Sequence, residues 1–206
     1  MRSAERFAWE AYTLPSIQAR FSPGTLVIDV GCGSGKELRQ LTESGCVGIG
    51  LDIDADALAN CRRNNLLVVL AQAEYMPLRT ASFGGLICTV AVPYTDESRV
   101  MQEIGRILKP GARGFFCYHG FGYFLRYILT GPTVRMRFYG VRSLLNTWFY
   151  RATGRRLSGF WGDTLYQTHG CLLKYYRRGG LKLVEAQAGR RFLGFPVFMY
   201  HTVEKA

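Results

Sequence analysis

The sequence has no closely paired cysteines and no long apolar run. Its six cysteines are widely separated and form no Cys-x-x-Cys pair, so neither a zinc site nor a disulfide framework is indicated. We therefore expect a reduced, cytoplasmic protein without a metal site. No apolar run approaches the roughly 18 residues that span a bilayer, and the first turns lack the apolar core of a signal peptide. The 206 residues suit one domain, and we expect residues 1–206 to form it.

Glycine, by contrast, is concentrated at one informative place. Residues 27–35 read Val-Ile-Asp-Val-Gly-Cys-Gly-Ser-Gly, an apolar strand pattern that runs into a glycine loop. Glycine permits positive φ and brings backbone N–H groups close to a ligand, and a helix start just beyond adds partial positive charge. A dinucleotide-binding fingerprint would need its third glycine at the position of Lys36. The spacing here is instead Asp-x-Gly-x-Gly-x-Gly, which begins at Asp29.

Apolar runs rich in β-forming residues alternate with helical patterns along the first half of the chain. The runs cover 26–30, 47–51, 67–71, 86–90 and 114–118, and the helical patterns cover 36–44, 55–64 and 97–108. This alternation predicts a parallel sheet covered on both faces. Ligands of such sheets lie beyond the carboxyl ends of the strands, where we expect Gly31, Asp52, Ala73 and Val90 to converge. Two further strands, 181–187 and 196–204, predict a terminal hairpin.

Four of these segments resemble the class I S-adenosylmethionine-dependent methyltransferases, in particular the small-molecule, methyltransferase type 11-like branch. They are the glycine loop, the strand Gly-Ile-Gly-Leu-Asp that ends at Asp52, the loop at 71–78, and the Leu-Lys-Pro-Gly turn at 108–111. The resemblance implies an α/β fold. It is a Rossmann-like, doubly wound, seven-stranded sheet with an antiparallel last strand and a helical insert after strand five. It also implies S-adenosylmethionine as cofactor and S-adenosylhomocysteine as product.

The resemblance further implies which residues hold the cofactor. In the family, the acid after the second strand binds the ribose hydroxyls, the next residue packs on adenine, and the loop at 71–78 lies beside it. The cofactor-binding residues implied here are Asp29, Gly31, Cys32, Gly33, Gly35, Asp52, Ile53, Gln72, Ala73, Glu74 and Val90. Gln72 stands where many relatives carry an Asp that accepts from the adenine amino group, and its amide oxygen also accepts.

Methyl transfer requires mainly positioning, because the sulfonium carbon is already electrophilic. A hydroxyl acceptor would benefit from a nearby base, a task that suits histidine. His119 ends strand five, the strand that faces the transferred methyl group in the family fold, and we select it as base or orienting residue. The alternative is a strand-end histidine bonded to backbone. Tyr94, in the loop after strand four, is a candidate acceptor contact, with a packed turn residue as the alternative.

The net charge of +11 arises in one segment. Residues 120–191 contain 13 Lys and Arg but only 2 Asp and Glu, whereas the two signs balance in 1–119 and in 192–206. This segment is also rich in aromatic residues, and it lies where the family inserts its substrate-covering element. We expect 120–166 to form a helical, substrate-covering insert and 1–25 to form an N-terminal cap helix, whose Trp9 and Tyr12 are candidates for a lid.

Apolar residues repeat at helical spacing in this insert and allow three interpretations. The repeats are Phe121, Phe124, Leu125, Ile128 and Leu129, then Val134, Phe138, Val141, Leu145, Trp148 and Phe149. The first interpretation is a helical cap packed on the sheet with its arginines in solvent. The second is a hydrophobic roof over the substrate that also rests on an anionic membrane surface. The third is an RNA groove, in which arginines pair with phosphates and aromatic rings stack on bases.

The sequence therefore predicts an enzyme that transfers a methyl group from S-adenosylmethionine to a small, lipophilic or aromatic acceptor. An RNA methyltransferase is the alternative enzyme. A non-catalytic, cofactor-binding partner protein is the alternative without activity. Besides the small-molecule acceptor, the expected partner is a membrane surface, contacted peripherally through 120–166, and RNA is the less favoured partner.

Overall fold

The computed structural model describes residues 20–155, 157 and 164–206. Trp9, Tyr12 and most of the expected N-terminal cap helix lie outside the described residues. Residues 20–25, its described part, form bends and a turn rather than a helix, as the Pro23-Gly24 pair favours. Seven strands form one sheet in the order β3-β2-β1-β4-β5-β9-β6. They are β1 (Leu26–Val30), β2 (Val47–Asp52), β3 (Leu67–Leu70), β4 (Phe83–Thr89), β5 (Leu108–His119), β6 (Leu181–Ala188) and β9 (Phe198–Lys205). Strand β9 runs antiparallel to both β5 and β6, so the predicted doubly wound sheet with an antiparallel last strand is confirmed.

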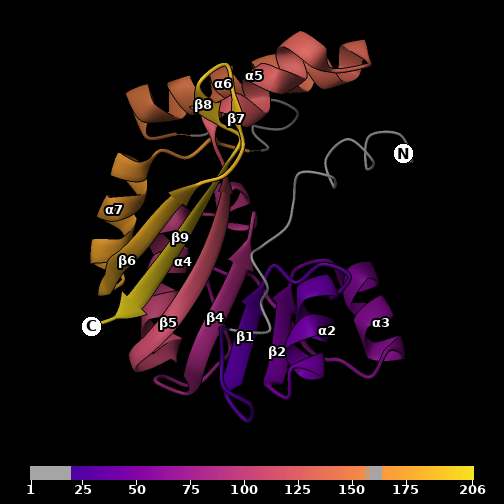
Figure 1. The fold of residues 1–206 in the computed structure, drawn as a ribbon, viewed down its shortest axis with the longest axis vertical. Helices are drawn as coiled ribbons and strands as arrows, with labels where there is room; N and C mark the ends of the chain where they lie inside the picture. Colours follow the sequence, from indigo (N-terminus) through magenta and orange to yellow (C-terminus); the bar gives the residue numbers. More distant parts are fainter. Residues whose placement is uncertain (1–19, 156, 158–163) are drawn as a thin grey trace.

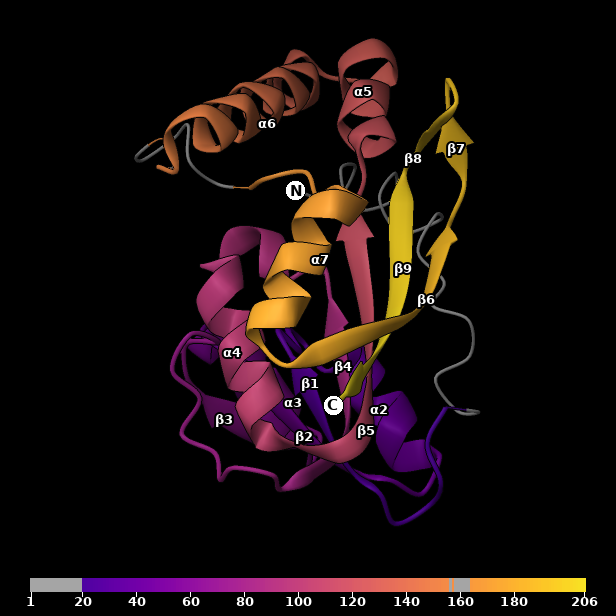
Figure 2. The same ribbon diagram turned by 90° about the vertical axis from the view of Figure 1, so that its left-hand side faces the viewer.

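Helices accompany the sheet on both faces, as Figures 1 and 2 show. They are α2 (Lys36–Glu43), α3 (Ala55–Arg63), α4 (Glu97–Ile107) and α7 (His169–Arg178). Asp54 caps α3 by accepting from the N–H groups of Asp56 and Ala57, and Asp96 caps α4 by accepting from that of Arg99. These caps satisfy N–H groups that have no partner within the helix. They also fix where each helix begins, directly after a loop at the carboxyl edge of the sheet.

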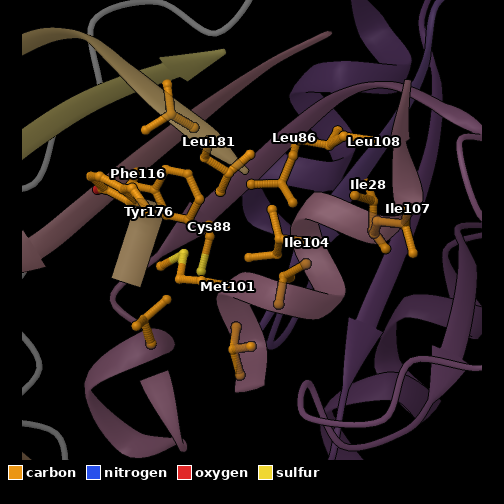
Figure 3. Packing of buried hydrophobic residues seen from close by; sticks show 14 of the residues in the cluster. Ile28, Leu86, Cys88, Met101, Ile104, Ile107, Leu108, Phe116, Tyr176 and Leu181 are labelled. Atoms are coloured by element: carbon orange, nitrogen blue, oxygen red, sulfur yellow. The ribbon is translucent and has the colours of Figure 1, made fainter. Parts of the chain in front are cut away.

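The core lies on both faces of the sheet, because successive strand residues point to opposite sides. Ile28 and Val30 of β1 join the large cluster that includes residues of α4 and α7, such as Met101 and Tyr176 (Figure 3). Val27, the residue before Ile28, points to the other side and packs with Leu41 of α2 and with Ile87. Both faces of β1 are therefore buried, which is why its sequence is almost uninterrupted in apolar residues.

The predicted element boundaries agree with the structure to within a few residues, except at β5. This strand begins at Leu108 rather than at the expected residue 114. Leu108 pairs with Phe83, and the register then shifts so that Arg113 pairs with Gly85. The Lys-Pro-Gly turn therefore lies inside the strand as an irregularity.

The segment after β5 forms two helices, α5 (Phe121–Thr130) and α6 (Val134–Thr153), which confirms that the insert is helical. A small hairpin, β7 (Arg191–Phe192) and β8 (Phe195–Pro196), extends the turn between β6 and β9. Figures 1 and 2 show α5, α6 and this hairpin together at one end of the molecule, above the carboxyl ends of the parallel strands. The insert is thus placed over the edge of the sheet where ligands bind in this architecture.

The apolar repeat of α6 faces away from the sheet, so the interpretation in which it packs there is wrong for this helix. Val134, Phe138, Val141, Leu145 and Trp148 are all exposed, whereas Arg142, Ser143, Asn146 and Thr147 are buried. The reason lies in backbone hydrogen bonding. Asn146 donates to the carbonyl of Thr164 and accepts from the N–H of Leu157, and Thr147 accepts from the N–H of Tyr166. The polar face of α6 thus satisfies backbone groups of the chain that returns to α7.

Within residues 20–155, 157 and 164–206, no helix is both long and apolar enough to cross a membrane.

Candidate active site

The glycine loop joins β1 to α2 and has the conformation that its spacing predicts. Gly31, Gly33 and Gly35 all have positive φ, at 75°, 50° and 83°. A Cβ at position 31 would collide with the Cβ of Ala91, in the loop that follows β4. A Cβ at position 33 would meet no atom within 4 Å. Gly31 therefore permits two loops to approach each other, while the backbone of Gly33 remains open toward the adjoining space.

Asp52, at the end of β2, is held against this loop. Its Oδ2 accepts a 2.7 Å hydrogen bond from the N–H of Gly33, and its Oδ1 accepts a 2.9 Å bond from the N–H of Asp54. Each bond fixes one oxygen and leaves that oxygen with further acceptor capacity, because an ionised carboxylate has about four lone-pair sites. The carboxylate is thus oriented before any ligand binds.

The first of two cavities at the carboxyl ends of the strands has a volume of about 580 Å³. Its lining residues are Gly31, Leu51, Asp52, Ile53, Ala71, Gln72, Ala73, Glu74, Thr89, Val90, Ala91, Tyr94 and Thr95. The predicted convergence of Gly31, Asp52, Ala73 and Val90 is confirmed. Most residues that the family resemblance assigns to adenosine binding lie in this one cavity.

The second cavity has a volume of about 270 Å³. Its lining residues are Gly31, Cys32, Gly33, Ser34, Lys36, Glu37, Thr89, Val90, His119, Tyr123 and Phe198. Gly31, Thr89 and Val90 line both cavities, so the two spaces adjoin at the glycine loop and the end of β4. One elongated ligand is able to contact both.

The junction of the cavities carries two features typical of a binding site. The buried Oγ1 of Thr89 has no hydrogen-bond partner among the described residues. Val90, a β-branched residue, has φ of 60°, which is unfavourable for such a side chain. An unpaired hydroxyl, oriented carboxylate oxygens and a loop backbone that is open at Gly33 together suit a ligand with sugar hydroxyls and a charged amino-acid end. The residues present therefore fit S-adenosylmethionine.

His119 lies in the second cavity and is 7% exposed. Its ring stacks on that of Tyr123 with centroids 3.8 Å apart, and its Nδ1 has no partner within the described part of the chain. Burial lowers the pKa of this imidazole to about 3. At neutral pH the ring is therefore uncharged and has a free acceptor nitrogen or a donor N–H, depending on the tautomer.

Two predicted cofactor residues, Asp29 and Gly35, lie outside both cavity linings. Asp29 is buried in β1, and burial, together with the nearby Glu37 and Asp52 carboxylates, raises its pKa well above the usual range. A Cβ at Gly35 would approach the Cys61 sulfur and Leu66 to 2.8 Å, so this glycine permits α2 to begin close to α3. Cys32 does line the second cavity, and burial raises the pKa of its thiol. The cofactor contacts of Asp29 and Gly35 remain predictions.

Tyr94 lies in the first cavity, not the second. It is the last residue of a short 3-10 helix turn, η2 (Val92–Tyr94), and its side chain interacts with that of Tyr139 of α6, whose pKa is raised by burial and by Tyr94. The structure thus brings His119 and Tyr94 to different cavities, and it links Tyr94 to the helical insert. The acceptor contact assigned to Tyr94 remains a prediction.

Sequence reasoning missed Thr89 and Phe198 and assigned no individual role to Tyr123. Thr89 is the last residue of β4, so the rule that ligands lie at strand ends was sufficient to find it. Tyr123 stood out only as one of many aromatic residues of the insert. Phe198 begins β9, far along the chain, and it reaches the cavity because β9 inserts beside β5 and pairs with His119. No local pattern in the sequence signals that contact.

Comparison with known proteins agrees with this geometry. Residues 28–116 match the family model described as a methyltransferase domain. A crystal structure of an S-adenosylmethionine-dependent methyltransferase from Mesorhizobium loti is similar, with a TM-score of 0.66 at 20% identity, over 93% of each chain. Residues 28–116, which contain the glycine loop and Asp52, thus match a methyltransferase domain, and the chain has the fold of S-adenosylmethionine-dependent methyltransferases of known structure.

Its relatives differ in what they methylate. The chain is 36% identical over 88 residues to a malonyl-[acyl-carrier protein] O-methyltransferase of Enterobacter lignolyticus, which covers 41% of this chain and 35% of the relative. It is 31% identical over 99 residues to the tRNA (carboxymethyluridine(34)-5-O)-methyltransferase alkbh8 of Xenopus tropicalis, which covers 46% of this chain and 15% of the relative. The chain therefore matches well under two thirds of the length of either relative, in a segment that is common to enzymes with unlike acceptors.

Proposed function

We propose that this protein transfers the methyl group of S-adenosylmethionine to a small, lipophilic or aromatic acceptor bound in the second cavity. The proposal rests on the apolar lining and the size of that cavity. Val90, Tyr123 and Phe198 supply apolar surface, and the volume of about 270 Å³ is near the lower end of the range for small-molecule sites. A single ring system or a short acyl group matches this space.

We assign the two cavities to different ligands on the basis of the residues that line them. We assign Asp52 to the ribose hydroxyls, and we assign Ile53 and Gln72, which line the same cavity, to adenine. When bound, S-adenosylmethionine supplies a methyl group on a positively charged sulfur. We assign the meeting point of that sulfur and the acceptor to the residues that line both cavities, Gly31, Thr89 and Val90.

We assign His119 an orienting role toward the acceptor. An imidazole with a pKa of about 3 is too weakly basic to keep a proton at neutral pH. A ring nitrogen of the uncharged imidazole instead accepts a hydrogen bond from an acceptor hydroxyl and directs an oxygen lone pair toward the methyl group. The stack on Tyr123 holds the ring plane in place. Positioning of this kind supplies most of what methyl transfer requires.

The test is methyl transfer from methyl-labelled S-adenosylmethionine to a panel of phenols, quinols and short fatty acids, with bulk RNA in parallel. We expect label in the organic phase.

We also expect Tyr123→Ala to raise the acceptor KM at least about tenfold, because the apolar ring is lost, with little change in cofactor affinity. Tyr75→Ala, at an exposed tyrosine outside both cavity linings, is the matched control. Label found only in RNA would reject the proposed acceptor, and tight cofactor binding without any transfer would favour a non-catalytic partner protein.

We further infer that the protein acts in the cytoplasm. All six cysteines are free thiols, five of them buried, and this state persists in a reducing compartment.

A further inference from the structure

The outward face of α6 carries a continuous apolar stripe. It consists of Val134, Phe138, Val141, Leu145 and Trp148, at alternating spacings of four and three residues, and we call it the α6 stripe. Its members are 40% to 84% exposed, with Val134 and Trp148 the most exposed, at 84% and 72%. Five large apolar side chains on one helix face exceed the scattered exposure expected of an ordinary surface.

The orientation of the stripe is fixed by the opposite face of the helix. Asn146 and Thr147 hold the backbone at Leu157, Thr164 and Tyr166, as described above. At Gly140, α6 approaches α5 so closely that a Cβ would lie 2.8 Å from the carbonyl oxygen of Phe124. Rotating the stripe inward would break the polar bonds and the close helix contact together. The stripe is therefore a stable outer surface of this fold.

The charge around the stripe has one sign. Residues 121–153, which form α5 and α6, contain no Asp or Glu. Arg135 and Arg137 are exposed at the start of α6, and Arg151 and Arg155 are exposed at its end. The apolar stripe thus has exposed arginines at both ends of the helix.

The β7–β8 hairpin adds a second apolar element at the same end of the molecule. Leu193, at its tip, is 66% exposed, and Phe195 is 46% exposed. The ring of Phe195 lies against that of Phe121 of α5, with centroids 4.8 Å apart, so the hairpin is attached to the insert (Figure 2). Arg190 and Arg191 at its base are exposed as well. Apolar side chains beside arginines therefore recur on both elements.

We propose that the α6 stripe and the hairpin tip dock onto the surface of an anionic membrane. Amphipathic helices that lie in the bilayer interface bury an apolar face, often with Trp, while their Lys and Arg residues contact anionic headgroups. The α6 stripe has that composition, and Trp148 is suited to the headgroup level. The docking surface lies at the end of the molecule that bears α5, whose Tyr123 lines the second cavity. Docking brings that cavity to the bilayer, from which a lipophilic acceptor would enter.

Two other occupants fit the same surface less well. A second copy of the chain would place one arginine-rich, acid-free face against another, and like charges would oppose this dimer. RNA binding relies on aromatic rings that stack on bases, whereas Val134, Val141 and Leu145 are aliphatic. Aliphatic surface gains most from contact with acyl chains.

The experiment measures binding of the full chain to large unilamellar vesicles by flotation. One set of vesicles is phosphatidylcholine alone, and the other contains about 30% phosphatidylglycerol, a fraction chosen to approximate an anionic leaflet. We expect binding to the anionic vesicles only, weakened by salt. Trp148→Ser should weaken it at least about tenfold through lost apolar burial. Arg135→Gln should weaken it about fivefold, the equivalent of about 1 kcal/mol for one basic residue.

Two variants elsewhere on the surface serve as controls. Leu67→Ser removes a 59% exposed leucine of β3, and Arg63→Gln removes an exposed arginine of α3. Both should leave vesicle binding unchanged, and all four variants should keep wild-type affinity for S-adenosylhomocysteine. Lack of vesicle binding by the wild type, or binding that Trp148→Ser leaves intact, would overturn the proposal. So would a dimer or an RNA complex that Trp148→Ser abolishes. Vesicle binding is measured without any methyl acceptor, so its result does not depend on whether the proposed reaction is correct.

Discussion

The backbone N–H of Gly33 donates a 2.7 Å hydrogen bond to the carboxylate of Asp52. This bond connects the glycine loop after β1 with the acid that ends β2, two segments that are 19 residues apart. Each segment is common as an isolated pattern. Their contact combines the two segments into one site, because the Asp52 carboxylate both stabilises the loop and lines the first cavity.

Replacing this carboxylate should weaken cofactor binding. Asp52→Ala removes both carboxylate oxygens. A hydrogen bond to a charged group contributes about 1.5 to 3 kcal/mol. We expect the dissociation constant for S-adenosylhomocysteine to rise at least about tenfold in isothermal titration. Asp56→Ala, at an exposed acid in the first turn of α3, is the control and should bind normally. Equal affinities for the Asp52 variant and the wild type would contradict the assigned role.

Gly31→Ala should be more damaging than the same change at Gly24. Both glycines have φ near 80°, where alanine is strained by about 1 to 2 kcal/mol. Only the Cβ at position 31 collides with Ala91, whereas the one at position 24 meets no atom within 4 Å. Urea denaturation should show the larger loss of stability for Gly31→Ala. Adding Ala91→Gly should restore part of it, and failure of that second change to help would show that the collision is not the cause.

The buried neutral imidazole of His119 should make stability depend on pH in a defined direction. Burial lowers its folded-state pKa to about 3, below the unfolded value near 6.5. Its contribution to stability is thus fully present above pH 6.5 and is lost as the pH falls toward 3, because only the unfolded chain then takes up the proton.

The variant His119→Gln lacks that proton uptake. The free energy of unfolding of the wild type, minus that of His119→Gln, should therefore fall between pH 6 and 5 by up to about 1.4 kcal/mol per pH unit. Denaturation curves at several pH values measure this difference. A difference that stays constant over that range would mean that His119 titrates normally in the folded state.

The hydroxyl group of Tyr176 should stabilise the folded protein. This group hydrogen-bonds the Tyr118 hydroxyl and Nδ1 of His201, each at 2.9 Å, inside the core. Tyr176→Phe leaves two buried polar atoms without this partner, and we expect a loss of about 2 to 4 kcal/mol. Tyr166→Phe removes an exposed bond to Arg151 and should lose less than about 1 kcal/mol. Similar losses for the two variants would argue against the buried network.

The sequence by itself determined the sheet and the loops that converge at its carboxyl edge. Apolar runs such as 26–30 are buried on both faces in a parallel sheet, and a glycine loop after a strand has few stable conformations, so these local patterns map directly onto structure. The convergence of Gly31, Asp52, Ala73 and Val90 followed because parallel strands end at one edge.

Only the tertiary structure decided which residues complete the second cavity and which way the insert faces. Phe198 reaches His119 because β9 pairs beside β5, a long-range contact that no local pattern encodes. On α6, the apolar repeat suggested packing, yet backbone groups of the returning chain required polar partners, and Asn146 and Thr147 supply them. An amphipathic pattern identifies two faces of a helix. Which face turns inward depends on what the neighbouring chain needs to bury or to bond, and that is settled only when the elements pack.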